Sequence, residues 1–247
     1  MERKDFPLNA QTLALLAHKL RTPLSVINGY CETALAQDKK ALPLTTAKAL
    51  QEINTQGLLL AQQVDKLLAF NQVFAMQEQD LQKQETPLKD LVKQVAAEAL
   101  AQAEKFPKPA EPENPGLRSG TFIETDCPPA LVVTADEKLL RLCILELLSN
   151  AIKFNPRAEK IIKIQCVNHG DRISVSVRDY GQGIRPQDIK RIFEPFYQVD
   201  DDFTGQVAGC GLGLSTVKQI AALHHGSVSV VSDRGLGSIF TLDLPIA

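Results

Sequence analysis

The sequence predicts two domains of different fold class: an all-α helical hairpin that forms a dimeric four-helix bundle, and an α+β sandwich that follows it. Three observations lead to this prediction. Apolar residues recur at steps of three and four before residue 76, the polar run 77–85 interrupts that spacing, and strand and helix patterns mix from residue 86 onward. The predicted boundaries are 1–76 for the hairpin, 77–85 for a linker and 86–247 for the sandwich.

The hairpin is predicted from two apolar stripes. The first helix, residues 8–36, carries Leu13, Leu16, Leu20, Leu24, Ile27 and Cys31. After a polar turn that ends at Pro43, the second helix carries Leu50, Ile53, Gly57, Leu60, Val64, Leu67, Asn71 and Phe74 with heptad spacing. One hairpin cannot bury both stripes, so a second copy of the chain is the expected partner. The alternative is a bundle with later helices of the same chain. The end of the regular apolar spacing at residue 76 argues against it.

The elements of the sandwich are predicted from caps, periodicity and turns. Thr86 suits an N-cap and Pro87 the first position of a helix that continues to about residue 105. Strands are expected at 121–126 and 130–136, a helix at 137–154, a strand hairpin at 160–181, a helix at 214–225 and a final strand hairpin at 226–245. His224 and His225 are expected as capping residues on the surface, at the end of the last helix.

Composition and charge exclude several classes of function. The net charge of −2 gives no electrostatic reason to expect nucleic acid or a membrane surface. No apolar run approaches the roughly 20 residues that a membrane-spanning helix needs, and the first residues do not form a signal peptide. The five cysteines include no CxxC pair and suit reduced thiols. We therefore expect a cytoplasmic protein with no nucleic-acid partner and no membrane segment.

The segment ELLSNAIKFN places three polar side chains on one face of a predicted helix. These are Glu146, Asn150 and Lys153, at spacings of four and three residues. A carboxylate, an amide oxygen and an ammonium group together suit a magnesium ion that carries a polyphosphate.

Two glycine-rich segments could hold other parts of a nucleotide. In DYGQGI, the Asp179 carboxylate can accept a hydrogen bond from the exocyclic amine of a base, while Gly181 and Gly183 let a planar ring approach the backbone. In GCGLGLS, three glycines precede a helix whose N-terminus favours phosphate: Gly209, Gly211 and Gly213. A tight turn explains either cluster taken alone. The spacing matches neither the Rossmann fingerprint nor a P-loop.

The order of the motifs is more specific than any one of them. The chain carries, in sequence, AHKLRTPLS, ELLSNAIKFN, DYGQGI, FEPFYQ and GCGLGLSTVKQI. This series resembles the H, N, G1, F and G2 boxes of the sensor histidine kinases of two-component signalling, over nearly the whole chain. The resemblance implies a dimerisation and histidine-phosphotransfer hairpin followed by the ATP-binding domain shared with gyrase-type ATPases. It also implies ATP and Mg²⁺ as cofactors, and the receiver domain of a response regulator as partner.

The resemblance assigns roles in the H box. His18 lies away from the apolar helix face and is expected to be the exposed phospho-acceptor. Pro23 removes a backbone donor nearby and is expected to loosen or bend the helix. Thr22 matches the family's residue that can orient a water molecule to dephosphorylate the response regulator.

The other boxes imply the ATP site. Its adenine end is expected at Asp179, Gly181 and Gly183, and its magnesium and phosphates at Glu146, Asn150 and Lys153. The base of the ATP lid is expected to be packed by Phe193 and Phe196, and the lid to be shaped by Gly209, Gly211 and Gly213.

Three positions depart from the family pattern. Lys19 follows the histidine directly, where the family usually has an acidic residue that accepts the ring proton. Neither Lys19 nor Arg21 can accept that proton, and general-base help contributes on the order of 10²–10⁴ in rate, so a slow autokinase or a base from elsewhere is expected. Glu146 stands where the family commonly has Asn, and can still bind magnesium. The lid segment 199–210 has three aspartates and no Lys or Arg.

Three alternatives stay open. The first is a catalytically weakened ATP-binding dimeric scaffold, which Lys19 and the acidic lid favour. The second is a phosphatase-biased regulator that acts through Thr22 on a response regulator. The third is a gyrase-like ATPase, which leaves the hairpin unexplained. No sensor region is recognisable in the sequence, so the signal is expected from a separate sensor subunit or from a region missing from this chain.

Overall fold

The structure is a computed structural model that describes residues 10–37, 43–104, 120–199 and 210–246. The chain divides into two compact units. The first contains the N-terminal helices up to Ala75, and the second begins at Met76 and contains the sheets.

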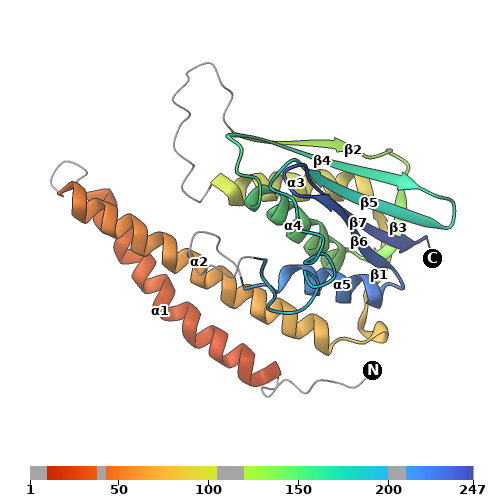
Figure 1. Cartoon of the computed structure of the whole chain (residues 1–247). Helices are drawn as coiled ribbons and strands as arrows, with labels where there is room; N and C mark the ends of the chain where they lie inside the picture. The colour runs from red at the N-terminus through yellow and green to blue at the C-terminus, as the bar shows by residue number, and fades with distance from the viewer. Residues whose placement is uncertain (1–9, 38–42, 105–119, 200–209, 247) are drawn as a thin grey trace. The chain divides into compact units, whose positions relative to one another are not determined.

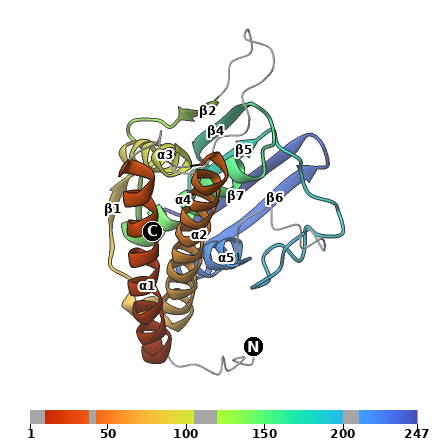
Figure 2. The same cartoon turned by 90° about the vertical axis from the view of Figure 1, so that its left-hand side faces the viewer.

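The first unit is a hairpin of two long helices, α1 (Ala10–Gln37) and α2 (Leu44–Ala75), which lie side by side and run in opposite directions (Figures 1 and 2). Both helices are where the apolar spacing predicts them. Helix α1 continues through Pro23. Among the described residues, no helix is both long enough and apolar enough to cross a membrane.

Only part of the predicted apolar stripe of α1 is covered within one chain. Among residues 17–36, the part of α1 whose side chains the structure describes, the buried ones are Ala17, Leu24, Asn28 and Cys31. A Cβ added at Gly57 of α2 would overlap the Asn28 side chain, so the two helices approach closely at this level. Leu20 and Ile27, expected on the buried face, are 47% and 44% exposed. A single neighbouring helix covers a narrower strip than the whole apolar stripe.

The second unit is built on a five-stranded mixed sheet with the strand order β2-β4-β5-β7-β6. Its strands are β2 (Gly120–Asp126), β4 (Glu159–Asn168), β5 (Arg172–Asp179), β6 (Ser227–Asp233) and β7 (Gly237–Pro245). β2 runs parallel to β4, and the other neighbouring pairs are antiparallel. A separate antiparallel pair is formed by β1 (Lys83–Pro87) and β3 (Val132–Asp136).

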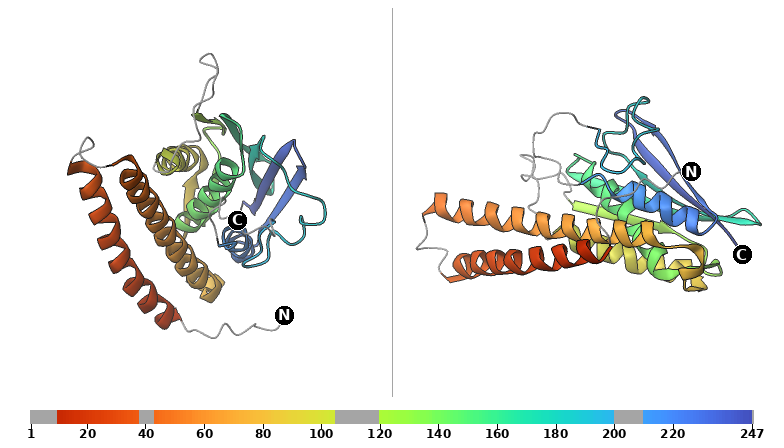
Figure 3. Two further views of the ribbon diagram at one scale, coloured as in Figure 1. Left: turned by 60° about the vertical axis from the view of Figure 1, so that its left-hand side comes forward. Right: turned by 90° about the horizontal axis from the view of Figure 1, so that it is seen from below.

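Three helices cover one face of the five-stranded sheet (Figure 3): α3 (Leu88–Glu104), α4 (Glu137–Lys153) and α5 (Gly213–Leu223). The strand residues in the core are apolar and include Ile162, Ile164, Ile173, Val175 and Val177, each at most 1% exposed. Asp136 caps α4, since its Oδ1 accepts hydrogen bonds from the N–H groups of Lys138 and Leu139. The predicted fold class is confirmed: a helical hairpin is followed by an α+β sandwich.

The connection between the hairpin and α3 differs from the prediction. Residues 77–85, expected as a linker, contain the short 3₁₀ helix Glu78–Asp80 and the first part of β1. Thr86 and Pro87, expected to begin a helix, end this strand opposite β3, and α3 begins at Leu88. Pairing with β3 satisfies the backbone of β1, which outweighs the local preference of these residues for a helix start.

His224, expected on the surface, is 5% exposed. Its Nδ1 lies 2.9 Å from the carbonyl oxygen of Ile220, and its Nε2 accepts a hydrogen bond of 3.0 Å from the N–H of Asp136. The ring therefore joins the end of α5 to the start of α4. His225 is exposed as expected, with its Nε2 2.7 Å from Oε1 of Glu78.

Candidate functional site

The H-box residues lie in the first half of α1. The side chains of His18, Lys19 and Thr22 are all exposed. The Thr22 hydroxyl donates a hydrogen bond of 3.2 Å to the backbone carbonyl oxygen of His18. The His18 side chain is therefore open to solvent, and the Thr22 hydroxyl oxygen can still accept a hydrogen bond from water while it donates to this carbonyl.

Arg21, three residues after His18, forms an ion pair with Asp65 of α2. Its Nε donates a hydrogen bond of 3.0 Å to Oδ1 of Asp65, and both side chains are about half exposed. Because such pairs are hydrated and screened, this one stabilises the hairpin by at most about 1 kcal/mol. Its greater effect is to compensate the Arg21 charge near the H box.

In the second unit, Asp179 ends β5 with its carboxylate buried, at 6% exposure. Oδ1 accepts a hydrogen bond of 2.8 Å from the N–H of Gly181. Burial raises the pKa of this carboxyl, and the backbone hydrogen bonds from Gly181 and Ser238 oppose that rise. A carboxylate accepts several hydrogen bonds at once, so Asp179 can still accept one from an amine.

The turn after Asp179 meets the C-terminal end of α4. The N–H of Gln182 donates a hydrogen bond of 3.1 Å to the carbonyl oxygen of Phe154, which caps that helix. A Cβ added at Gly181 would overlap the same carbonyl oxygen, so only glycine permits this approach. On its other side the turn contacts the β6–β7 connection, because Gly183 lies against the backbone of Asp233.

Helix α4 carries the three polar residues of the N box on successive turns. They are Glu146, which is 7% exposed, and Asn150 and Lys153, which are half-buried. The ammonium group of Lys153 lies 4.7 Å from the centroid of the Phe154 ring. The backbone contact of Phe154 with the turn after Asp179 thus brings two of the predicted motifs together.

The start of α5 brings a third motif to α4. A Cβ added at Gly213, the first residue of α5, would overlap the carboxylate of Glu146. The N-cap residue of α5 is Leu212, whose side chain makes no capping hydrogen bond, and the N-terminus of a helix attracts anions. Gly211 has a positive φ of 68° just before this helix. Gly209 and the three aspartates of the predicted lid lie outside the described residues.

The two phenylalanines of the F box have different surroundings. The Phe193 ring packs edge-on against Phe240 of β7, with 6.5 Å between ring centroids. Phe196 is 51% exposed, and its N–H donates a hydrogen bond of 2.9 Å to the carbonyl oxygen of Gly211. Phe193 therefore anchors the F box to the sheet, and the backbone of Phe196 connects it to the segment before α5.

Sequence reasoning missed a polar cluster around Asp188. Its carboxylate, 4% exposed, accepts hydrogen bonds from Nε of Arg185 at 2.6 Å and from the hydroxyl of Tyr197 at 2.7 Å. The hydrogen bonds from Tyr197 and Arg185 lower the pKa of Asp188. Arg185 also donates to the carbonyl oxygen of Val199 at 2.8 Å, so the cluster holds the segment that leads into the lid. In the sequence, Tyr197 within the FEPFYQ motif was the feature that could have indicated this cluster.

These residues fit a nucleotide accompanied by a divalent cation. A phosphate at the N-terminus of α5 would lie near the Glu146 carboxylate, and the two anions repel unless a cation lies between them. Among the described residues, no group of three or more His, Cys, Asp or Glu side chains could hold a metal ion by itself. Carboxylate and amide oxygens such as those of Glu146 and Asn150 are typical ligands of a magnesium ion that also binds phosphate oxygens.

Two family models match the chain. Residues 8–73 match the His Kinase A phospho-acceptor domain. Residues 135–247 match the histidine kinase-, DNA gyrase B- and HSP90-like ATPase.

Similar proteins include sensor kinases from several bacteria. The sensor-like histidine kinase SenX3 of Mycobacterium tuberculosis is 31% identical over 98% of this chain, and the match covers 54% of SenX3. The sensor histidine kinase RcsC of Salmonella typhimurium is 32% identical over 95% of this chain, which covers 23% of RcsC. The chain thus spans about half the length, or less, of these relatives.

A solved structure agrees with these matches. Full-length ShkA in complex with AMPPNP has a TM-score of 0.64 and 28% identity, and the alignment covers 97% of this chain and 46% of ShkA. The catalytic domain of the histidine kinase ThkA shares a fold with 67% of this chain, with a TM-score of 0.51 at 23% identity over 96% of that domain. Both family models agree with two features of the structure. These are the exposed histidine on a helical hairpin and the polar and glycine-rich motifs that meet at α4. The chain belongs to the sensor histidine kinases of two-component systems.

Proposed function

We propose that this chain is a kinase core that phosphorylates His18 from Mg-ATP and then passes the phosphoryl group to an aspartate in the receiver domain of a response regulator. One observation supports the proposal most: an exposed histidine, with Thr22 one turn later, lies on a hairpin in the same chain as an ATP-binding fold. A scaffold that only binds ATP has no need of an exposed acceptor.

The transfer step forms one bond and breaks one. A ring nitrogen of His18 attacks the γ-phosphorus of ATP, the bond from that phosphorus to the β–γ bridging oxygen breaks, and ADP leaves. Such reactions depend mainly on positioning and charge stabilisation. In our proposal Asp179 orients the adenine, while Lys153 and the N-terminus of α5 contact the phosphates. Magnesium, held by Glu146 and Asn150 together with the phosphates, would supply charge neutralisation.

The attacking ring must also lose its N–H proton. Lys19 carries three N–H donors and no acceptor when charged, so it cannot take this proton as an acidic residue would. Water or a more distant group is then the acceptor. We therefore propose that the kinase is slow for its family.

We also propose that the chain acts as a homodimer. Among the described side chains, five large apolar ones from the predicted stripes of the hairpin stay uncovered in one chain: Leu20, Ile27, Ile53, Leu60 and Phe74, each 41–49% exposed. Repeated large apolar side chains along two neighbouring helices are typical of a surface that another copy covers. A four-helix bundle made by two hairpins would bury them.

The proposal is tested by incubating the purified chain with Mg-ATP labelled at the γ-phosphate. We expect acid-labile, alkali-stable label on the native chain and none on His18→Gln. His225→Gln is the matched control, because it removes an exposed histidine outside the hairpin and should keep the label. A native chain that binds ATP but takes up no label would instead support a scaffold.

Transfer to the partner needs its own experiment. The labelled chain is mixed with a panel of purified receiver domains, and label should move within seconds to one of them and not to its Asp→Asn variant. Label that stays on His18 with every receiver would contradict the transfer step while leaving the autokinase intact.

A further inference from the structure

Two cysteines of the second unit occupy neighbouring positions on adjacent strands. In the parallel pair β2–β4, each residue lies opposite the residue 39 positions later, from Gly120 opposite Glu159 to Asp126 opposite Gln165. Cys127 follows β2 directly, and the same offset places it opposite Cys166 of β4. Pro128 favours an extended backbone at Cys127, which continues the register.

The two thiols point to the same side of the sheet and interact. Cys166 is 3% exposed, on the face that also buries Ile162 and Ile164, while Cys127 is half-buried. Burial raises the pKa of Cys166, and the neighbouring Cys127 side chain raises it further. Burial also raises the pKa of Cys127. Solvent therefore reaches the pair from the Cys127 side.

The backbone spacing permits a covalent bond between them. Adjacent strands lie about 4.8 Å apart, within the range of roughly 4.4–6.8 Å between Cα atoms that disulfides span. The Cβ atoms of a directly opposed pair are somewhat farther apart than a relaxed disulfide prefers. Cys127 lies just beyond the end of β2, outside the paired residues of the β2–β4 ladder.

We propose that Cys127 and Cys166 form a dithiol modification site that peroxide converts into an intramolecular disulfide. The Cys127 thiolate attacks one oxygen of hydrogen peroxide, the O–O bond breaks, and a sulfenic acid and water are produced. The Cys166 sulfur then attacks the Cys127 sulfur and water leaves. Two thiols and one peroxide thus give one disulfide and two waters, and peroxide is the species reduced.

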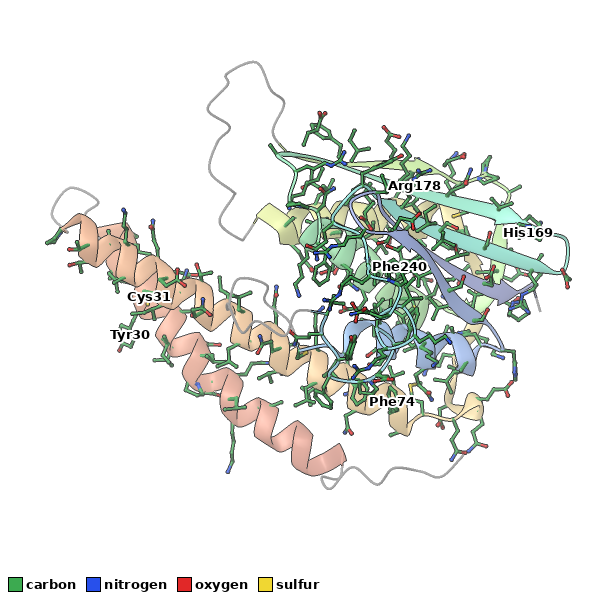
Figure 4. The ribbon with its side chains drawn as sticks, in the orientation of Figure 1. Tyr30, Cys31, Phe74, His169, Arg178 and Phe240 are labelled. Carbon is green, nitrogen blue, oxygen red and sulfur yellow. The ribbon has the colours of Figure 1, made fainter. Side chains whose placement is uncertain are left out.

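The cysteine pair lies away from the predicted ATP site. However, the loop that the disulfide would close contains residues of that site. Cys166 lies three residues before His169 of the β4–β5 turn, whereas Asp179 is the last residue of β5, at the strand's other end. Figure 4 shows His169 at that turn and Arg178 toward the other end of β5. Asp179 pairs with Ile162, about 13 Å along β4 from Cys166. The loop that the disulfide closes, residues 127–166, contains all of α4 with Glu146, Asn150 and Lys153. Oxidation should therefore restrain α4 without blocking the nucleotide.

The test is oxidation of the 247-residue chain with hydrogen peroxide, followed by intact mass measurement and peptide mapping under non-reducing conditions. We expect a monomeric product lighter by two hydrogen atoms, with Cys127 joined to Cys166, which dithiothreitol reverses. Because only the thiolate reacts, formation should accelerate about tenfold per pH unit below the thiol pKa. The thermal midpoint of the second unit should rise by about 4–12 °C in the oxidised form.

Two variants make the outcome decisive. Cys127→Ser removes the more exposed thiol and should abolish the intramolecular product. The matched control Cys210→Ser removes another half-buried thiol and should leave the product unchanged. Oxidation of native protein that yields only sulfinic acids, or a disulfide between other cysteines, would overturn the proposal. So would a product that persists in Cys127→Ser.

Discussion

At the residue scale, the position after His18 offers a direct test of proton transfer. Lys19→Glu places a carboxylate where the family usually has one, and both Lys19 and His18 are exposed, so the change should not disturb packing. We expect the initial rate of autophosphorylation to rise at least about tenfold, because general-base help contributes on the order of 10²–10⁴. Lys19→Gln is the control. It removes the charge without supplying a base, and an equal rise in this variant would show that charge, and not proton acceptance, limits the rate.

Asp179 allows a second prediction about a single side chain. Asp179→Asn keeps one oxygen that can accept the hydrogen bond from the N–H of Gly181. It replaces the other carboxylate oxygen by an NH₂ group, which cannot accept a hydrogen bond from adenine. ATP should then bind about 10- to 100-fold more weakly, the loss expected for one hydrogen bond to a charged group. Titration with a fluorescent ATP analogue measures the change. Asp171→Asn, an exposed aspartate in the β4–β5 turn, should leave affinity within about twofold. Unchanged affinity in Asp179→Asn would remove this residue from the adenine site.

At the element scale, the two helices of the hairpin contain a matched pair of glycines with opposite expectations. Gly57→Ala in α2 should destabilise the hairpin by about 1–3 kcal/mol, because the new Cβ would overlap the buried side chain of Asn28. Gly29→Ala in α1 meets no atom within 4 Å and should stabilise the helix by about 0.5–1 kcal/mol. Urea unfolding followed by circular dichroism measures both. Equal effects of the two substitutions would mean that the helices do not approach at Gly57.

The contact between α5 and α4 should depend on pH through His224. Burial lowers the pKa of this ring below its usual value near 6.5, so the folded state favours the neutral form that accepts from Asp136. The unfolded chain then binds more protons just below that value, and stability is lost as the pH falls from about 7 toward 5. The urea midpoint of the second unit should fall over this range. The change of the urea midpoint with pH should be smaller in His224→Gln and unaltered in the control His169→Gln. If His224→Gln keeps the native pH dependence, another group is responsible for it.

Most elements were predictable from the sequence because their signals are local. The strands at 159–168 and 172–179 and the helix at 137–153 follow from alternation, apolar spacing and caps. The errors arose where distant segments compete with a local preference. Thr86 and Pro87 favour a helix start, yet pairing with β3 extends them into a strand. His224 resembled a surface cap because its partner, the N–H of Asp136, is 88 residues away in the chain.

At the scale of the whole molecule, motifs far apart in the sequence meet on one helix. The carbonyl of Phe154 contacts the turn after Asp179, and Glu146 contacts the start of α5 at Gly213. The sequence supplied the identity and order of these motifs through a family resemblance. It did not indicate that α4 is the element they share, because that depends on close backbone approaches at glycines. The Asp188 cluster escaped notice for a related reason, since Arg185 and Asp188 resemble an ordinary surface pair until Tyr197 joins them.

The uncovered stripe of the hairpin makes a prediction about assembly. Ile27→Glu places a charge among the exposed apolar side chains that the proposed dimer buries, and an unpaired buried charge is costly for each copy. We expect the dimer to dissociate at least about 100-fold more readily, measured by analytical ultracentrifugation over a range of concentrations. Ser25→Glu is the matched control, because it is exposed on the side of α1 that carries His18 and should leave the dimer intact. ATP affinity should not change in either variant, since the nucleotide contacts lie in the second unit. If Ile27→Glu dimerises as well as the native chain, the stripe serves another partner, and the four-helix bundle proposed here is wrong.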